Sequence, residues 1–193
     1  KKRTEAEHGD NRIRFLKEIV RVSEENAKLT HQELLAKKKV VVVGGDQTVS
    51  LGTIAGASAA CGGDLGVIWI DAHGDMMMHE NTLSGNVHGM PAAAAMGIGH
   101  PELVNIFKSG AKIKPENFLF IGLKDLDQDE INLIRQKNLS VVTIMDYLQK
   151  GFAHITGKID ELSKRVKNIW VCLDLDVIDK DDAPATLMGS NGS

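Results

Sequence analysis

Five short runs of β-branched and aromatic residues constrain the fold of this chain more than any other feature of its sequence. Each run is apolar almost throughout, and stretches with helical spacing separate most of them. The predicted strands are Val40–Gly44, Val67–Asp71, Phe118–Gly122, Val141–Ile144 and Ile169–Asp174. Apolar strands that alternate with helices form parallel sheets covered on both faces. We therefore predict an α/β fold, a three-layer sandwich with a doubly wound, mostly parallel sheet.

The stretches between the runs have the spacing of amphipathic helices. The longest is Ile13–Lys37, in which we expect a break near Thr30. The other predicted helices are Thr48–Ala60, Met90–Met96, Glu102–Phe107, Asp129–Lys137 and Tyr147–Val166. The sequence shows no repeat or linker, and 193 residues suit one domain or most of one. We predict a single domain over residues 1–193.

Composition excludes several classes of partner. Hydrophobic residues make up 42% of the chain and charged residues 25%, which is ordinary globular composition. A net charge of −3 gives no reason to expect nucleic acid or an anionic membrane surface as a partner. The longest apolar runs are too short to span a bilayer. The two cysteines, Cys61 and Cys172, lie in or beside apolar segments, which predicts reduced thiols and a cytoplasmic protein.

Two of the predicted strands end in acidic residues and histidine. The first of them leads into Asp71, His73 and Asp75, and the last leads into Asp174 and Asp176. Alternate residues of an extended chain share a face, so each set can converge on one point. Open parallel sheets place their ligands beyond the carboxyl ends of the strands, which is where these residues lie.

Such a concentration of negative charge predicts bound cations. Carboxylates gathered at two strand ends repel one another unless cations compensate them, and carboxylate oxygens with imidazole suit Mn²⁺, Fe²⁺ or Zn²⁺. Taken singly, an Asp after a strand is more often a helix cap or turn former, and His73 alone is more often a structural histidine. The run Val40–Gly44 also ends in polar residues, where Asp46 or Thr48 can cap the next helix. We expect the other two runs to end without metal-binding residues.

A polar loop follows the first acidic cluster and leads into a helix of small residues. It contains Ser84, Asn86 and His88, which offer hydrogen-bonding groups and a proton donor. Loops at this edge of a sheet commonly contact substrates, although a solvated loop explains the same residues.

Several of these motifs, in this order, resemble the ureohydrolases, and arginases of bacteria most closely. The motifs are Asp-Ala-His-x-Asp from Asp71, Ser-Gly-Asn-x-His-Gly from Ser84, and Asp-x-Asp-x-x-Asp from Asp174. The resemblance runs from about Val40 to Pro184. It implies the arginase-like fold and Mn²⁺-dependent hydrolysis of the guanidino group of L-arginine to ornithine and urea. It also implies a small guanidino substrate, a homo-oligomer (trimer or hexamer), and a chain that is incomplete at both ends.

The resemblance also implies a role for each matching residue. Asp71 and Asp174 would bridge two Mn²⁺ ions, with His73 and Asp176 completing one site. Asp75 would belong to the other site and to the catalytic set. In the substrate loop, His88 would match the proton-shuttling histidine, and the residues that would contact the amino-acid end of arginine are Ser84 and Asn86.

The chain departs from the family pattern at two positions that bear on activity. Gln47 stands where the family has a histidine ligand, and an amide oxygen binds such ions more weakly than imidazole. Met77 stands where arginases have a substrate-contacting asparagine. Two alternatives therefore stay open. One is another ureohydrolase, acting on agmatine, guanidinobutyrate or formiminoglutamate. The other is a weakly active or inactive metal-binding homologue with a structural or regulatory role.

Overall fold

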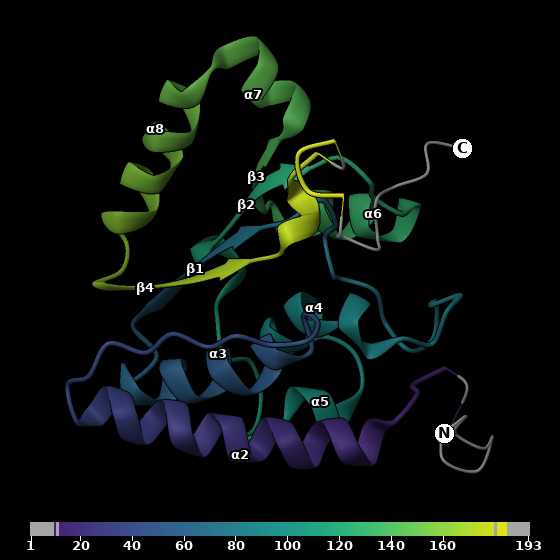
Figure 1. Cartoon of the computed structure of the whole chain (residues 1–193), viewed down its shortest axis with the longest axis vertical. Coiled ribbons are helices and arrows are strands. Elements are labelled where there is room, and N and C mark those ends of the chain that lie inside the picture. The colour runs from purple at the N-terminus through teal and green to yellow at the C-terminus, as the bar shows by residue number, and fades with distance from the viewer. Residues whose placement is uncertain (1–9, 11, 180, 185–193) are drawn as a thin grey trace. The chain divides into compact units, whose positions relative to one another are not determined.

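A computed structural model describes residues 10, 12–179 and 181–184. The chain divides into two compact units (Figure 1). The first unit consists of Lys1–Asp64 and Asp75–Lys114, and the second consists of Leu65–Gly74 and Pro115–Ser193. Among the described residues, no helix combines the length and the apolar character that crossing a bilayer requires.

The first unit is built on two helices packed in close contact, α2 (Leu16–Leu35) and α3 (Val49–Ala60). A Cβ atom at Gly52 would lie 2.2 Å from the carbonyl oxygen of Ser23, and one at Gly56 would lie 2.3 Å from that of Ala27. Only glycine allows the two backbones to approach so closely. The predicted break near Thr30 is wrong, because α2 continues through this buried residue.

Short elements complete the first unit. They are the 3₁₀ helix η1 (Val87–Gly89), α4 (Pro91–Ala95) and α5 (Pro101–Val104), the last being shorter than predicted. Proline occupies the first turn of both α-helices, where its missing N–H is not needed. Their buried side chains join those of α2 and α3 in one core, which contains Ile13, Ala27, Leu51, Ala55, Val87, Met90, Ala94, Leu103 and Ile106.

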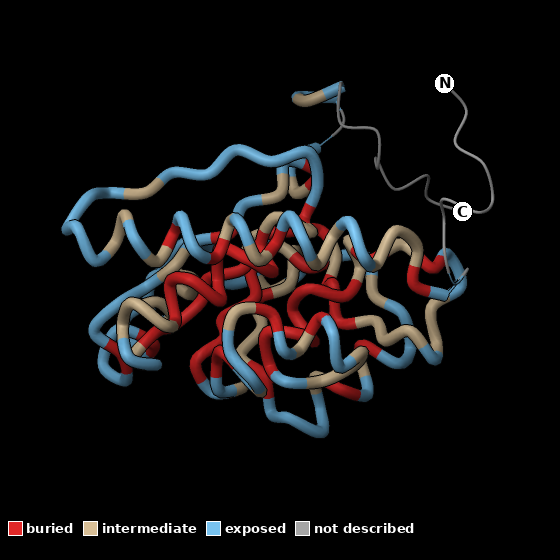
Figure 2. Tube along the Cα trace, turned by 90° about the horizontal axis from the view of Figure 1, so that it is seen from below, coloured by how far each residue is buried: buried red, intermediate tan, exposed pale blue. Residues whose placement is uncertain are grey.

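The predicted strand Val40–Gly44 is wrong, because the described segment 38–44 contains no helix or strand. Val41 is 87% exposed and Val43 is 93% exposed. The segment belongs to a long exposed stretch of the trace (Figure 2). β-branched residues favour an extended backbone, but a strand also requires a hydrogen-bonded neighbour. The sequence pattern indicates the preference for an extended backbone, but it does not indicate whether a neighbouring strand is present.

The second unit contains a parallel sheet of four strands in the order β3-β2-β1-β4 (Figure 1). The register pairs Ile68 of β1 with Leu119 of β2 on one side and with Val171 of β4 on the other. This confirms the predicted parallel α/β arrangement and four of the five predicted strands. The strands are β1 (Leu65–Ile70), β2 (Phe118–Leu123), β3 (Ser140–Thr143) and β4 (Asn168–Leu173).

Helices lie between and after the strands of the second unit in the sequence. The predicted helix Tyr147–Val166 is two helices, because Gly151 adopts a positive φ of 70° between them. Leu162 and Val166, at the end of the second helix and just beyond it, pack on the sheet face that carries Ile68. The elements are η2 (Pro115–Asn117), α6 (Gln128–Lys137), α7 (Ile144–Lys150), α8 (Phe152–Ser163) and η3 (Leu175–Val177).

Candidate metal centre

The pairing of β1 with β4 brings their carboxyl ends side by side within the second unit. Hydrogen bonds continue past the last strand residues, since the N–H of Asp174 donates to the carbonyl oxygen of Ile70 at 2.9 Å. On the other side, the N–H of Asp71 donates to the carbonyl oxygen of Ile121 at 3.1 Å. The backbone on which the first acidic residue of each motif sits is therefore held by the sheet.

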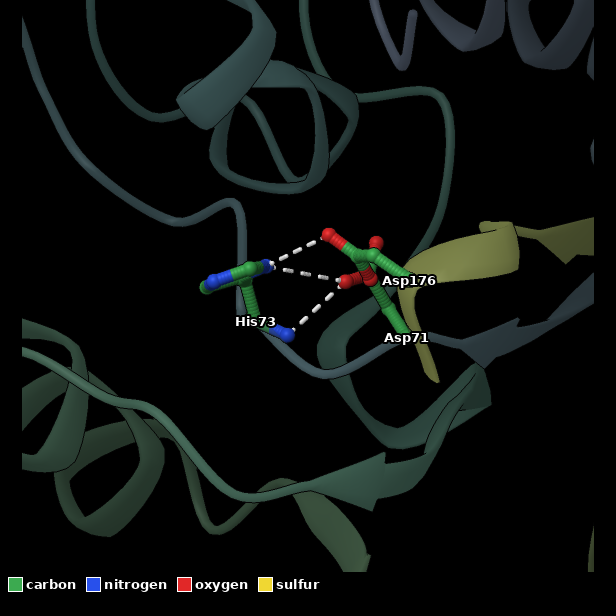
Figure 3. Close-up of side chains that lie close together, drawn as sticks. All are labelled: Asp71, His73 and Asp176. Atoms are coloured by element: carbon green, nitrogen blue, oxygen red, sulfur yellow. Dashed lines mark hydrogen bonds and ion pairs between the residues drawn. The ribbon is translucent and has the colours of Figure 1, made fainter. Parts of the chain in front are cut away.

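Three of the predicted ligands converge on one point (Figure 3). Nδ1 of His73 lies 3.1 Å from Oδ2 of Asp176 and 3.5 Å from Oδ1 of Asp71. One ligand atom from each of the three residues lies within 4.8 Å of the others. Asp71 and Asp176 are buried, and His73 is half-buried.

Backbone hydrogen bonds orient the carboxylates of this cluster. Oδ1 of Asp71 accepts from the N–H of His73 at 2.8 Å. Oδ1 of Asp174 accepts from the N–H of Asp176 at 3.0 Å, at the start of η3. Two-residue turns of this kind are typical of Asp and hold the side chain against its own backbone. Asp174 is half-buried beside the three converging residues.

The electrostatics of the cluster show how strongly its members interact without a metal. The hydrogen bond to Asp176, and then that to Asp71, raises the pKa of His73 to about 10. Burial favours the neutral form of Asp176, but the hydrogen bond and the charge of His73, together with hydrogen bonds from Ala72 and Asp71, outweigh burial and lower the pKa of Asp176. Burial, aided by the neighbouring charges of Asp176 and Asp71, raises the pKa of Asp174. A protonated His73 therefore places a positive charge next to these carboxylates.

The donor set fits a divalent cation. Two carboxylates and one imidazole converge with their ligand atoms already close together, and this combination suits hard or borderline ions such as Mn²⁺. With a divalent ion bound, His73 would ligate through a deprotonated nitrogen, and the ion would supply the charge that compensates the carboxylates. Asp71, His73 and Asp176 can therefore hold a metal, with Asp174 beside them.

The other two predicted ligands belong to the first unit. Asp75 is buried with a left-handed φ of 49°, and its carbonyl oxygen accepts from the N–H groups of Ala92 and Ala93 near the start of α4. Gln47 is buried in the turn before α3, where its carbonyl oxygen accepts from Ser50. Nearby, Asp46 holds the turn before the helix by accepting from the N–H of Thr48 at 2.8 Å. Thr48 is the N-cap residue of α3, and no side chain caps this helix, so the predicted capping role is not seen.

The predicted substrate loop contributes to a pocket of about 630 Å³ within the first unit. Asn86 and His88 line this pocket together with Asp46 and Thr48. Ser84 is exposed, and its Oγ accepts from the N–H of Asn86 at 3.2 Å. Two of the three predicted loop residues are thus brought together around one cavity.

One candidate residue escaped the sequence analysis. Asp125 lies with its Oδ2 atom 3.9 Å from Nε2 of His73. It follows β2, a strand that we expected to end without metal-binding residues. The acidic residue stands two positions beyond the strand, whereas Asp71 and Asp174 follow their strands directly. The acidic stretch Asp125–Glu130 could have pointed to Asp125 as a metal-site residue, but it is equally typical of the start of a helix such as α6.

Comparison with known proteins identifies relatives of the whole described chain. Residues 4–190 match the profile of the Arginase family. The chain is 40% identical to an arginase of Bacillus caldovelox over 179 residues, which is 92% of this chain and 60% of that protein. It is 37% identical to an arginase of Bacillus subtilis over 175 residues, which is 91% of this chain and 59% of that protein. The chain therefore spans about 60% of the length of these relatives.

Solved structures give the same result for the fold. The crystal structure of the Bacillus caldovelox arginase matches with a TM-score of 0.91 and 38% identity, over 95% of this chain and 62% of that one. A formimidoylglutamase of Bacillus subtilis matches with a TM-score of 0.69 at 22% identity, over 86% of this chain and 48% of that one, which shows a shared fold alone.

Proposed function

Because the chain belongs to the Arginase family, we propose that it hydrolyses the guanidino group of L-arginine to ornithine and urea with two Mn²⁺ ions. The observation that carries this proposal is the convergence of Asp71, His73 and Asp176 beyond the carboxyl ends of β1 and β4. Relatives that are 37–40% identical and are named arginases support the substrate.

The acidic residues of the second unit hold the metal in this proposal. Asp71 and Asp174, each fixed by a strand end and by a backbone hydrogen bond, would be shared between the two ions. His73 and Asp176 complete the first ion site. Divalent ions held there would lower the pKa of water to near neutrality and so supply a hydroxide nucleophile for the guanidinium carbon.

Residues of the first unit have the remaining roles. We assign Asp75 and Gln47 as further metal ligands, and Asp75 also belongs to the catalytic set. His88 moves a proton to the leaving amine, as an imidazole does well near neutral pH. The residues proposed to hold the amino and carboxylate groups of arginine are Asn86, which lines the pocket with His88, and Ser84.

The assembly and location of the protein are part of the same proposal. We expect a cytoplasmic homo-oligomer, a trimer or a hexamer, with a small guanidino compound as its substrate. Sedimentation at several concentrations of the chain measures the oligomeric state. A monomer at all concentrations would contradict it.

Urea release tests the proposed reaction. Purified protein is incubated with L-arginine and added Mn²⁺, and urea and ornithine are measured together. We expect both products in equal amounts, and we expect EDTA to abolish the reaction and Mn²⁺ to restore it. The variant Asp71→Asn serves as the inactive control. Metal binding without urea from arginine would remove the substrate assignment.

The same assay separates the related hydrolases. Agmatine and guanidinobutyrate release urea, whereas formiminoglutamate releases formamide. Faster turnover of one of these compounds than of arginine would move the assignment to that substrate.

Two residues favour a second candidate, a metal-binding homologue with weak activity or none. Gln47 offers a neutral amide where the family has imidazole, and Met77 offers no polar group toward a substrate. Metal counting discriminates the candidates. Two Mn²⁺ per chain at micromolar concentration support the hydrolase, and one or none supports the homologue.

A further inference from the structure

A third strand end reaches the metal centre. After β2, the chain turns back onto the loop that follows β1, and the N–H groups of Lys124 and Asp125 both donate to the carbonyl oxygen of Ala72, at 2.9 and 3.0 Å. Ala72 directly precedes His73. The backbone of Asp125 is therefore tied to the loop that carries the histidine.

Gly122 makes this return possible. It has a φ of +95°, and the pairing of β2 with β3 shifts register between Ile121 and Leu123. A Cβ atom at Gly122 would lie 2.5 Å from Cγ2 of Val177, in η3, and 3.2 Å from the carbonyl oxygen of Asp71. The turn thus requires glycine for both its conformation and its space, and it fixes the end of β2 against the two segments that carry the ligands.

The two nitrogen atoms of His73 face different carboxylates. Nδ1 faces Asp71 and Asp176, at 3.5 and 3.1 Å, and Nε2 faces Oδ2 of Asp125 at 3.9 Å. An imidazole that binds a metal through Nδ1 carries its proton on Nε2. Metal-binding histidines almost always donate that proton to a carboxylate, a carbonyl oxygen or water, which sets the tautomer and the orientation of the ring.

We propose that Asp125 is a positioning residue for His73, accepting a hydrogen bond from Nε2 and directing Nδ1 toward the metal. This inference rests on the proposed metal-dependent function. The 3.9 Å separation is longer than a direct hydrogen bond of about 2.7–3.2 Å. A small rotation of the exposed aspartate, or one bridging water, closes the gap when the metal binds.

The exposure of the Asp125 side chain limits how much this residue can contribute to stability and to metal affinity. The side chain of Asp125 is 62% exposed, so its attraction to a charged imidazole contributes little to stability by itself. Its contribution is the orientation of a ligand, which is measured as metal affinity. Loss of such a partner typically weakens metal binding by about 10–100-fold, and we expect the lower end of that range here.

The test is the Mn²⁺ affinity of the full chain and its variants, measured by EPR of free Mn²⁺. We expect Asp125→Ala to weaken binding about tenfold and Asp125→Asn, which keeps an oxygen acceptor, to weaken it less. Asp125→Glu, whose longer side chain can also reach Nε2, should restore affinity to within about threefold of the parent chain. Asp160→Asn on α8 removes the same charge from an exposed position in the same unit, and should leave affinity unchanged.

A second readout follows the histidine itself. In the zinc-loaded protein, nitrogen NMR should show His73 with its proton on Nε2, and Asp125→Ala should broaden or shift this signal while Asp160→Asn does not. Parent-like affinity and an unchanged signal in Asp125→Ala would overturn the positioning role alone. If the parent chain bound no Mn²⁺, the proposed function would fail and this inference with it.

Discussion

In the second unit, Asp71 and Asp174 directly follow neighbouring, hydrogen-bonded strands. In the first unit, Gln47 lies in the turn before α3 and Asp75 lies in the loop between β1 and η1, five residues beyond the strand. A parallel sheet forces the ends of its strands to one edge, so residues that follow two adjacent strands meet there. Turns have no such common edge. The position of Asp75 depends on its left-handed backbone and on its hydrogen bonds to the start of α4.

The two units also differ in how they pack. The first brings α2 and α3 together through glycines that leave no room for a side chain, as at Gly56. The second packs branched side chains, such as Leu162 on Ile68, over a sheet. The proposed function of the second unit therefore depends on charge placed at strand ends, and the packing of the first unit depends on close backbone contact.

The largest expected effect is on metal binding at the strand ends. Asp71→Asn removes a buried carboxylate that faces His73, and we expect Mn²⁺ affinity to fall by about a hundredfold or more, beyond the range for an indirect partner. Thermal unfolding with and without Mn²⁺ measures it, because a ligand that binds only the folded state raises its stability. An equal Mn²⁺-induced shift in both proteins would show that Asp71 is not a ligand.

The next effect tests packing with a matched pair of glycines. A Cβ at Gly56 would lie 2.3 Å from the carbonyl oxygen of Ala27, and one at Gly157 on α8 would meet nothing within 4 Å. We expect Gly56→Ala to lower the free energy of unfolding by about 1–3 kcal/mol. Gly157→Ala should raise it by about 0.5–1 kcal/mol, because alanine favours the helix. Denaturant titration measures both. Equal shifts in the two variants would contradict the close approach of α2 and α3.

A smaller effect is expected at Gln47. Imidazole binds Mn²⁺ more tightly than an amide oxygen, so Gln47→His should strengthen binding of the second ion about tenfold, or on the order of 1.4 kcal/mol. Isothermal titration with Mn²⁺ measures the number of ions and their affinities, and Gln47→Ala is the control. If Gln47→His and Gln47→Ala bind alike, the residue is not a ligand.

The smallest expected effect is on stability, at a helix cap that is not part of the candidate metal centre. Thr143 and Asp146 form a reciprocal cap at the start of α7, with hydrogen bonds of 3.0 and 3.1 Å to each other's N–H groups. Thr143→Ala should cost about 1 kcal/mol of stability.

The same pair has a defined pH dependence. The hydrogen bond from Lys150, and then those from Thr143, hold the pKa of Asp146 below its usual value of 3.8. A lowered pKa means that the contribution to stability is present above pH 3.8 and is lost as the pH falls below it. The difference between Thr143→Ala and the parent chain should therefore narrow in acid. A constant difference from pH 7 to pH 3 would show that the charge of Asp146 does not contribute.

Local sequence patterns predicted the elements that tertiary contacts support. Runs such as Val67–Asp71 and Ile169–Asp174 became paired strands, and the helix over Thr48–Ala60 formed almost as expected. The run Val40–Gly44 is also rich in β-branched residues, but it formed no strand. Composition describes the preference of a segment for an extended backbone, and pairing depends on which neighbour the fold supplies.

Some residues of the candidate metal centre could be predicted from local patterns, and others could not. Alternation along two extended segments predicted that Asp71 and His73 share a face and that Asp174 and Asp176 share another, because side chains two residues apart lie on one face. The pairing of β1 with β4 then brings Asp71, His73 and Asp176 together. Asp125 could not be found by that rule. It reaches His73 only because Gly122 turns the end of β2 back onto the loop after β1, and nothing in the local pattern relates residue 125 to residue 73.

The sequence by itself determined the parallel α/β class, the acidic strand ends and the resemblance to a metal-dependent hydrolase family, since these depend on short-range periodicity and residue chemistry. The tertiary structure alone decided the order of the strands, the approach of Asp125 to His73, and the close contact of α2 with α3. These depend on which distant segments meet, and that is set by the packing of the chain as a whole.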